Sequence, residues 1–369
     1  MKELNWESYP LTVSPEEMIP FDMARAERIA ERTRALYSGK TKTMIAIECA
    51  AWETTQKVPD LNLLRLPEDM EAFLDTIAVR EYQMSKYHEK LDDDWLHAAK
   101  PRYGIAEMSA FLGGKVDFAT DTTYQHPICA ELSDFRNLKL DRDNLWLRLV
   151  MDGLDYMQKK WGKYVPICMR GSHGPSDLAN AIRGNDIFYD IYEAPDELHE
   201  LMHFCAQAVR WYTDQQRALV TPILDGIISG FGMWMPGRCM GHIGDDLSTM
   251  LSEEAFEEHF LPSLLECVDG YDSVFLHTHS LGHRMLPKYA AIDQIDIIEI
   301  SNDPNTTSSA EAFRQYHDVL ANKVAMVRLN YEELLSIKDC LGDSRVYLCV
   351  STKNEEEAKR ALELVEKYR

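Results

Sequence analysis

The second half of the chain alternates short apolar runs with longer stretches of helical periodicity, and this alternation limits the fold more than any other feature. Such runs, joined by amphipathic helices, are typical of parallel strands connected by crossover helices. The runs that we expect to be strands are 164–170, 225–232, 273–279, 296–301, 324–330 and 345–351. The expected connecting helices, with apolar residues near i, i+3, i+4 and i+7, include 195–219, 252–271 and 355–368.

The first half is less regular, and we expect it to supply the start of the same fold. Residues 14–37 combine a Ser cap signal, early acidic residues and helical spacing of apolar residues, which predicts one or two helices. An early strand is expected at Met44–Cys49, and two more before residue 150, around 102–113. An open doubly wound sheet would need a glycine-rich phosphate loop, which this sequence lacks. We therefore predict an α/β fold, a (β/α)8 TIM barrel with an N-terminal helical extension.

The length and composition of the chain indicate how many domains it forms and in which compartment it works. With 369 residues, of which 45% are hydrophobic, it can bury one large core. No linker-like tract interrupts it, so we expect a single domain over 1–369, with 1–60 as an N-terminal extension packed on the barrel. The eight cysteines form no CxxC pair, and no secretory leader or run of roughly 20 apolar residues is present. These features predict reduced thiols in a cytoplasmic protein without a membrane anchor.

The formal net charge of −22 limits the classes of molecule that this protein can bind. Nucleic-acid phosphates are bound by clustered Lys and Arg, which this sequence does not supply, so nucleic acid is excluded as a partner. The charge also counts against a polyanionic substrate held by surface charge alone. We expect a small-molecule substrate, and association of two copies into a homodimer is left open.

Two histidines stand where a barrel carries its chemistry, at the carboxyl end of a strand. His277 and His279 close an expected strand, and residues at i and i+2 point to one face, so their imidazoles should converge. A metal ion explains such a pair, and three protein ligands with one open position are typical of catalytic zinc. Cys349, at the end of the last expected strand, is our third ligand, with Glu299 and His283 as other candidates. A hydrogen-bonded histidine pair and a core cysteine are the alternatives.

A second group of candidates lies in and before the segment 239–256. Asp245 and Asp246 precede a helix capped by Ser252, and paired acids in such a loop can orient a substrate, act as a general base or bind a cation. We predict a catalytic role for this pair, with a solvated turn as the alternative. Aromatic and sulfur side chains concentrated in a loop favour a ligand wall over a core, although burial remains an alternative. The predicted substrate-binding residues here are Phe231, Trp234, Met235 and His242.

A third segment, 167–184, ends an expected strand at Arg170 and continues through His173 into a helix. Backbone amides at that helix start, together with the Arg170 guanidinium, could hold an anion. We therefore include Arg170 among the catalytic candidates and His173 among the substrate-binding ones. The alternative is a tight turn in which Gly174 supplies an unusual backbone angle and Pro175 starts the helix.

Three segments in this order, 174–202, 244–266 and 274–300, resemble the uroporphyrinogen-decarboxylase superfamily, including its corrinoid-linked methyltransferase branch. The resemblance covers roughly the C-terminal 200 residues and is looser before residue 160. It implies a TIM barrel, methyl transfer and a corrinoid carried by a partner protein.

The methyltransferase branch binds zinc through a His-x-Cys and a later Cys. In this sequence His277 matches the first ligand, His279 stands where the first Cys would be, and Cys349 falls near the second. Replacing a thiolate by an imidazole makes the site less electron-rich. The Gly-Cys-Gly setting of the branch is absent around Cys349. True porphyrinogen decarboxylases carry an Arg-rich motif ending in Gly-Arg-Tyr, which Pro101-Arg102-Tyr103-Gly104 does not reproduce, so porphyrin decarboxylation is disfavoured.

These inferences give one leading hypothesis and two others. The leading one is a zinc-assisted methyltransferase or demethylase that moves a methyl group between a small molecule and a corrinoid protein. The second is a metal-independent decarboxylase or lyase of a small carboxylic acid, which would use Arg170 and the histidines electrostatically. The third is a non-catalytic barrel that binds a ligand.

Overall fold

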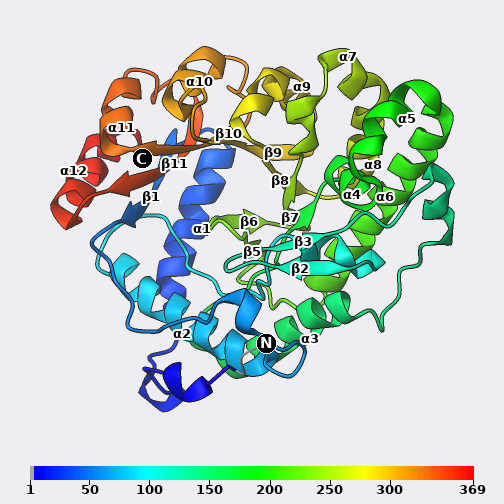
Figure 1. Cartoon of the computed structure of the whole chain (residues 1–369). Coiled ribbons are helices and arrows are strands. Elements are labelled where there is room, and N and C mark those ends of the chain that lie inside the picture. Colours follow the sequence, from blue (N-terminus) through cyan, green and yellow to red (C-terminus); the bar gives the residue numbers. More distant parts are fainter. Residues whose placement is uncertain (1–3) are drawn as a thin grey trace.

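A computed structural model describes residues 4–369 and has a parallel sheet of seven strands at its centre (Figure 1). The strand order is β1-β11-β10-β9-β8-β7-β4. The strands are β1 (Thr43–Cys49), β4 (Ser172–His173), β7 (Cys239–Gly244), β8 (Ser273–His277), β9 (Ile295–Ile300), β10 (Val324–Asn330) and β11 (Arg345–Thr352). From β4 to β11 the strands of this sheet follow one another in chain order, and β1 lies beside β11.

An extended segment, 94–100, fills the gap between the two ends of this sheet. The backbone N–H of Asp94 donates to the carbonyl of Ile45 on β1, at 2.7 Å. Further along, Ala99 forms a parallel bridge with Ile167, on the stretch that leads into β4. The seven strands and this segment are eight extended segments that close into a ring, so the predicted (β/α)8 barrel is confirmed.

Helices surround the sheet (Figure 1). They are α1 (Met23–Tyr37), α2 (Met70–His88), α3 (Leu145–Trp161), α4 (Pro175–Arg183), α5 (Ile187–Glu193), α6 (Pro195–Arg217), α7 (Glu253–Ala255), α8 (Leu261–Val268), α9 (Leu286–Ala290), α10 (Ser309–Tyr316), α11 (Tyr331–Ile337) and α12 (Glu355–Val365). Helices outside and side chains inside bury both strand faces, which is why runs such as Val324–Val327 are apolar throughout. Within residues 4–369, no helix is long and apolar enough to cross a membrane.

Two antiparallel hairpins supplement the barrel: β2 (Val116–Phe118) with β3 (Thr123–Gln125), and β5 (Gly226–Ile228) with β6 (Trp234–Pro236). The second hairpin corrects our expectation of a barrel strand at 225–232. That run is the first arm of the hairpin, and β7, which we treated as a loop, takes the place in the barrel. The turn passes through Gly232 at φ 77°, a conformation that favours glycine, so the chain reverses here instead of crossing the sheet.

The remaining expectations divide between the two halves of the chain. The predicted strands at 273–279, 296–301, 324–330 and 345–351 correspond to β8, β9, β10 and β11. The expectation of strands around 102–113 is wrong, because this stretch forms the short 3-10 turns Ala106–Met108 and Ala110–Leu112. The early strand expected at Met44–Cys49 is β1, which lies inside the range 1–60 that we assigned to an extension.

Candidate metal centre

Three side chains at the carboxyl end of the barrel bring one potential ligand atom each to a common point. Asp246, His277 and His279 place these atoms within 4.8 Å of one another. A carboxylate oxygen of Asp246 lies 3.8 Å from His277 Nε2, and the other lies 3.5 Å from His279 Nε2. The two rings have their centroids 5.1 Å apart at 74°. The convergence that we predicted for the two imidazoles is therefore present.

Local backbone geometry positions each member of the group. His277 is the last residue of β8, and His279 follows two residues later. Asp246 lies in the turn after β7, where the carboxylate of Asp177 accepts the backbone N–H of Asp246 at 2.9 Å and of Leu247 at 2.8 Å. Asp177, on α4, is thus a positioning residue that the sequence analysis did not single out.

Each imidazole has a second carboxylate on its other nitrogen. His277 Nδ1 donates to Glu299 on β9 at 2.5 Å, and His279 Nδ1 lies 3.1 Å from both oxygens of Asp303. These contacts fix the tautomer in which both Nε2 atoms turn toward Asp246. Histidines that ligate metals almost always donate their other N–H in this way, which orients the ring and raises its basicity.

The electrostatics of the group favour a bound cation. Hydrogen bonding to Asp246 raises the pKa of His279 to about 9, and Asp303 adds to the effect. Burial alone would lower the pKa of His277, but Glu299 and Asp246 outweigh it and raise the pKa. Burial alone would raise the pKa of Asp246, but the two imidazoles outweigh it and lower the pKa. Three carboxylates and the guanidinium of Arg328 thus surround two imidazoles, and with the imidazoles neutral the remaining negative charge suits a divalent ion.

The donor set also fits zinc in its chemistry. Two imidazole nitrogens and one carboxylate oxygen form a known catalytic zinc set with an open fourth position. Ligands held at about 2.0–2.1 Å in a tetrahedron lie about 3.3 Å apart, and the two oxygens of Asp246 lie 3.8 and 3.5 Å from the Nε2 atoms of His277 and His279. In addition, Asp246 Oδ1 is buried without a hydrogen-bond partner among the described residues. A buried oxygen left unsatisfied carries a free-energy cost that a metal bond removes.

Cys349 is not a member of this group. It lies on β11, beside Ala46 on one neighbouring strand and Arg328 on the other, and it is buried. Burial raises the pKa of its thiol, which keeps it in the protonated form that binds metals poorly. Arg328 in turn pairs with the free oxygen of Glu299, at 2.6 Å. Asp246 therefore takes the position that we expected Cys349 to fill.

The other two candidate ligands are placed differently. Glu299 supports His277 from behind, as described above. His283, on the turn after β8, is buried and has no hydrogen bond on either ring nitrogen among residues 4–369. Burial lowers the pKa of His283 to about 4, against the opposing charge of Asp303.

The predicted acid pair separates into two roles. Only Asp246 faces the imidazoles, because Asp245 points into the protein, where its oxygens accept from Ser176 and, at 2.6 Å, from Tyr289. Burial raises the pKa of Asp245 to about 6. Its backbone N–H donates to the carbonyl of His277 at 3.0 Å, which ties the turn after β7 to the end of β8. Asp245 is therefore placed as a structural neighbour of the group.

Phe231 and His242 lie directly beside the candidate ligands. Phe231, at the tip of the β5–β6 hairpin, stacks on His277 with centroids 5.8 Å apart and touches Phe275 at 4.8 Å. The buried His242 meets Phe231 edge-on at 4.9 Å, and burial lowers the pKa of its imidazole well below the usual value. Together these rings make an apolar floor under the group.

Trp234 and Met235 do not lie with Phe231 and His242, although we predicted all four as substrate-binding residues. Both are fully buried on β6, where Trp234 Nε1 donates to the carbonyl of Ile223 at 2.9 Å and Arg34 lies over the ring. The chain leaves β6 toward the start of β8, since Arg238 N donates to Asp272 at 2.7 Å. These two side chains therefore pack at the amino end of the barrel, opposite the candidate ligands.

Arg170 and His173 are both buried next to the group. The Arg170 guanidinium is occupied by the protein itself, because it pairs with the buried Glu107 and donates to the carbonyl of Gly104 at 2.9 Å. His173 on β4 lies 3.9 Å from Asp177, and burial lowers its pKa to about 4. Arg170 is therefore paired within the protein and, contrary to our expectation, is not free to hold an anion. Its partner, Glu107, was not among the residues that we predicted from the sequence.

Comparisons with known proteins agree with this fold. A model of the family described as uroporphyrinogen decarboxylase (URO-D) matches residues 96–219. The solved structure of a methyltransferase from Methanosarcina mazei superimposes with a TM-score of 0.57 at 14% identity, over 92% of this chain and 98% of that chain. No curated protein sequence matches this chain.

The family match begins earlier than the three segments that suggested the resemblance and includes only the first of them, 174–202. It includes Arg170 and His173 but none of the three candidate ligands. At 14% identity, the structural likeness shows the fold alone. The match thus relates residues 96–219 to the uroporphyrinogen-decarboxylase family, and the superposition shows that the fold of the chain is similar to that of a methyltransferase.

Proposed function

We propose that this protein is a zinc-assisted methyltransferase or demethylase that moves a methyl group between a small molecule and a corrinoid carried by a partner protein. One observation carries the proposal: Asp246, His277 and His279 converge at the carboxyl end of the barrel, and both imidazoles have a further carboxylate behind them. Active sites of barrel enzymes lie at this end. The methyltransferase fold and the family match support the reaction class.

The residues of the site divide the work between them. His277, His279 and Asp246 would hold the ion, which when bound polarises the heteroatom that releases or accepts the methyl group. Glu299 and Asp303 keep the two imidazoles oriented. The rings of Phe231 and Phe275 exclude water from below. His277 and His279 are themselves partly exposed, with 24% and 42% of their side-chain surface accessible, so a substrate can approach them from the rim.

The rim of the barrel is also where we place the partner. A methyl group passes directly between the cobalt of a corrinoid and the heteroatom of the small molecule, so the corrinoid domain must reach the exposed side of His279.

All eight cysteines are free and buried, which supports our expectation of a reducing, cytoplasmic setting.

Elemental analysis and a transfer assay test this proposal together. The purified wild type is expected to contain zinc and to form methylcobalamin from cob(I)alamin and a panel of methylated small molecules. The His279→Ala variant should lose both, because one of three ligands is gone. A wild type that contains no zinc and transfers no methyl group would overturn the proposal. Turnover that persists in a chelator would favour the metal-independent lyase instead.

A further inference from the structure

A cavity of about 400 Å³ lies beside the segment 94–100, outside the metal centre. It is bounded by α2, by the loops at 58–61 and 120–121, and by the tip of the β5–β6 hairpin. The two loops follow β1 and segment 94–100, so the cavity lies toward the carboxyl end of the barrel. Its volume is within the range of roughly 300–1,000 Å³ that is usual for small-molecule sites.

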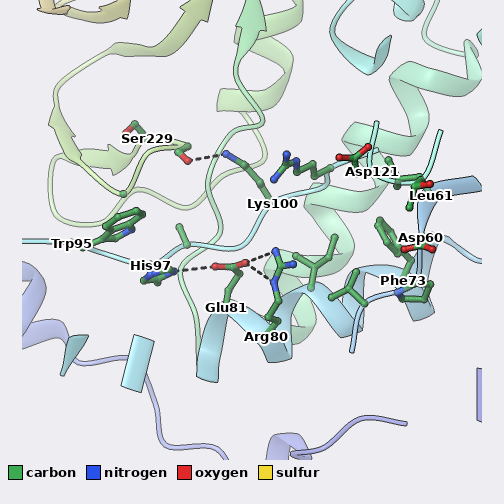
Figure 2. A pocket seen from close by; sticks show the side chains of 18 residues that line it. Asp60, Leu61, Phe73, Arg80, Glu81, Trp95, His97, Lys100, Asp121 and Ser229 are labelled. Atoms are coloured by element: carbon green, nitrogen blue, oxygen red, sulfur yellow. Dashed lines mark hydrogen bonds and ion pairs between the residues drawn. The ribbon is translucent and has the colours of Figure 1, made fainter. Parts of the chain in front are cut away.

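Two cations with few partners face this cavity. Lys100 Nζ donates to the carbonyl of Gly230 at 2.9 Å, its sole hydrogen bond within residues 4–369 (Figure 2). An ammonium has three donors, so two remain unused. Arg102 also lines the cavity, and in the described part of the chain it makes no hydrogen bond or ion pair. Unpaired cations stand out in a chain whose formal net charge is −22.

These two cations lie close to a third, Arg170, and the nearest carboxylates, Glu81 and Glu107, are each paired with another arginine. Burial lowers the pKa of Lys100 to about 8, and the charges of Arg170 and Arg102 act in the same direction. Burial and Arg170 likewise lower the pKa of Arg102. The carboxylate of Glu107 is engaged by Arg170. An anion bound between Lys100 and Arg102 would remove this repulsion.

The acids of the cavity do not compete for these cations. Glu81 is engaged on one side by His97 at 3.0 Å and on the other by Arg80 at 2.9 Å (Figure 2). Asp60 and Asp121 belong to the two loops and are exposed, so solvent screens their charge.

The rest of the wall is apolar and aromatic. Phe73 and Ile77 come from α2, and Trp95 from the segment 94–100 (Figure 2). A ring or short hydrocarbon would pack against these side chains while a charged end meets Lys100 and Arg102.

From this arrangement we infer that the cavity is a binding site for a small organic carboxylate, whose anionic end is held by Lys100 and Arg102 and whose apolar body packs on Phe73, Ile77 and Trp95. The inference goes beyond the proposed function and holds whether or not the chain transfers methyl groups.

Calorimetric titration with benzoate and with benzamide tests this site, because the two probes share a shape and differ in charge. The wild type is expected to bind benzoate at least tenfold more tightly than benzamide. The Lys100→Met and Arg102→Met variants should each lose this preference while keeping the weak affinity for benzamide. Lys139→Met, the same change at an exposed lysine, is the matched control and should bind as the wild type does.

Arg102 is exposed, so its variant is expected to fold even where the change at Lys100 disturbs packing, and thermal melting of both variants checks this. Equal affinity of the wild type for the two probes would overturn the inference. Undiminished binding of benzoate by folded Arg102→Met would overturn the role of Arg102. Loss of zinc in His279→Ala with benzoate binding intact would separate this site from the metal centre.

Discussion

The candidate metal centre and the neighbouring cavity hold opposite imbalances of charge. Around His277 and His279, three carboxylates meet two imidazoles, and one buried oxygen of Asp246 has no partner. Lys100 and Arg102 lie close to a third cation, Arg170. The nearest acids that are not paired with another residue lie on exposed loops. Because charges of one sign that lie close together at a cavity repel one another, each imbalance indicates the sign of what the site binds. The first site therefore calls for a cation and the second for an anion.

The largest expected effect comes from removing one ligand of the metal centre. His277→Ala should lower the zinc content from about one ion per chain to near none, because two remaining ligands rarely hold catalytic zinc. The matched control is His283→Ala, which removes a nearby histidine outside the ligand group. Equal zinc content in the two variants, measured by elemental analysis, would contradict the assignment.

A smaller loss is expected from the carboxylate behind the ring. Glu299→Gln keeps the size of the side chain but removes the charge that orients His277, and such changes cost about 10–100-fold in metal affinity. Competition with a chromogenic chelator measures the affinity. Glu363→Gln, on the exposed face of α12, is the control and should leave the affinity unchanged. An unchanged affinity in Glu299→Gln would show that the outer carboxylate has no part in holding the ion.

A third prediction uses the histidine that lacks a carboxylate partner. His283 has a folded-state pKa of about 4, below its ordinary value of 6.5, so the unfolded chain takes up a proton that the folded chain resists. This group therefore favours folding fully above pH 6.5 and loses that contribution as the pH falls toward 4. His283→Leu should make the melting temperature fall less between pH 7 and pH 5. An unchanged acid sensitivity would mean that His283 is hydrogen-bonded in solution.

The smallest expected effect concerns Cys349, which we predicted from the sequence as the third ligand. Cys349→Ser should leave zinc content and zinc affinity unchanged, since the thiol lies on β11 beside Arg328 and outside the ligand group. Titration of zinc into the metal-free variant measures this directly. A loss as large as that of His277→Ala would return Cys349 to the ligand set.

Apolar strands made half of the barrel predictable. β8 to β11 are buried on both faces, so their residues are apolar in uninterrupted runs. The segment 94–100 lacks such a run because carboxylates take over part of the strand pairing there. Asp94 Oδ2 accepts the backbone N–H of Ile45 at 2.9 Å, and Asp93 Oδ2 accepts that of Ile47 at 3.1 Å. A strand that pairs through its side chains leaves no apolar pattern to detect.

The candidate site, like the barrel, was predictable from the sequence only in part. The i, i+2 spacing of His277 and His279 predicted their convergence, because strand geometry fixes it. The third ligand was not predictable, because Asp246 lies in a turn that Asp177 holds from α4, 69 residues away along the chain. Sequence spacing could not separate Asp246 from Asp245, whose side chain turns to Tyr289. Trp234 and Met235 were misplaced because the hairpin reverses at Gly232 and returns them to the amino end.

The most direct test of the central claim is X-ray absorption at the zinc edge on the purified protein. We expect zinc surrounded by nitrogen and oxygen at about 2.0–2.2 Å, with the imidazole scattering of two histidines and no sulfur. A zinc–sulfur distance of about 2.3 Å would place a cysteine in the shell and contradict the assignment of Asp246.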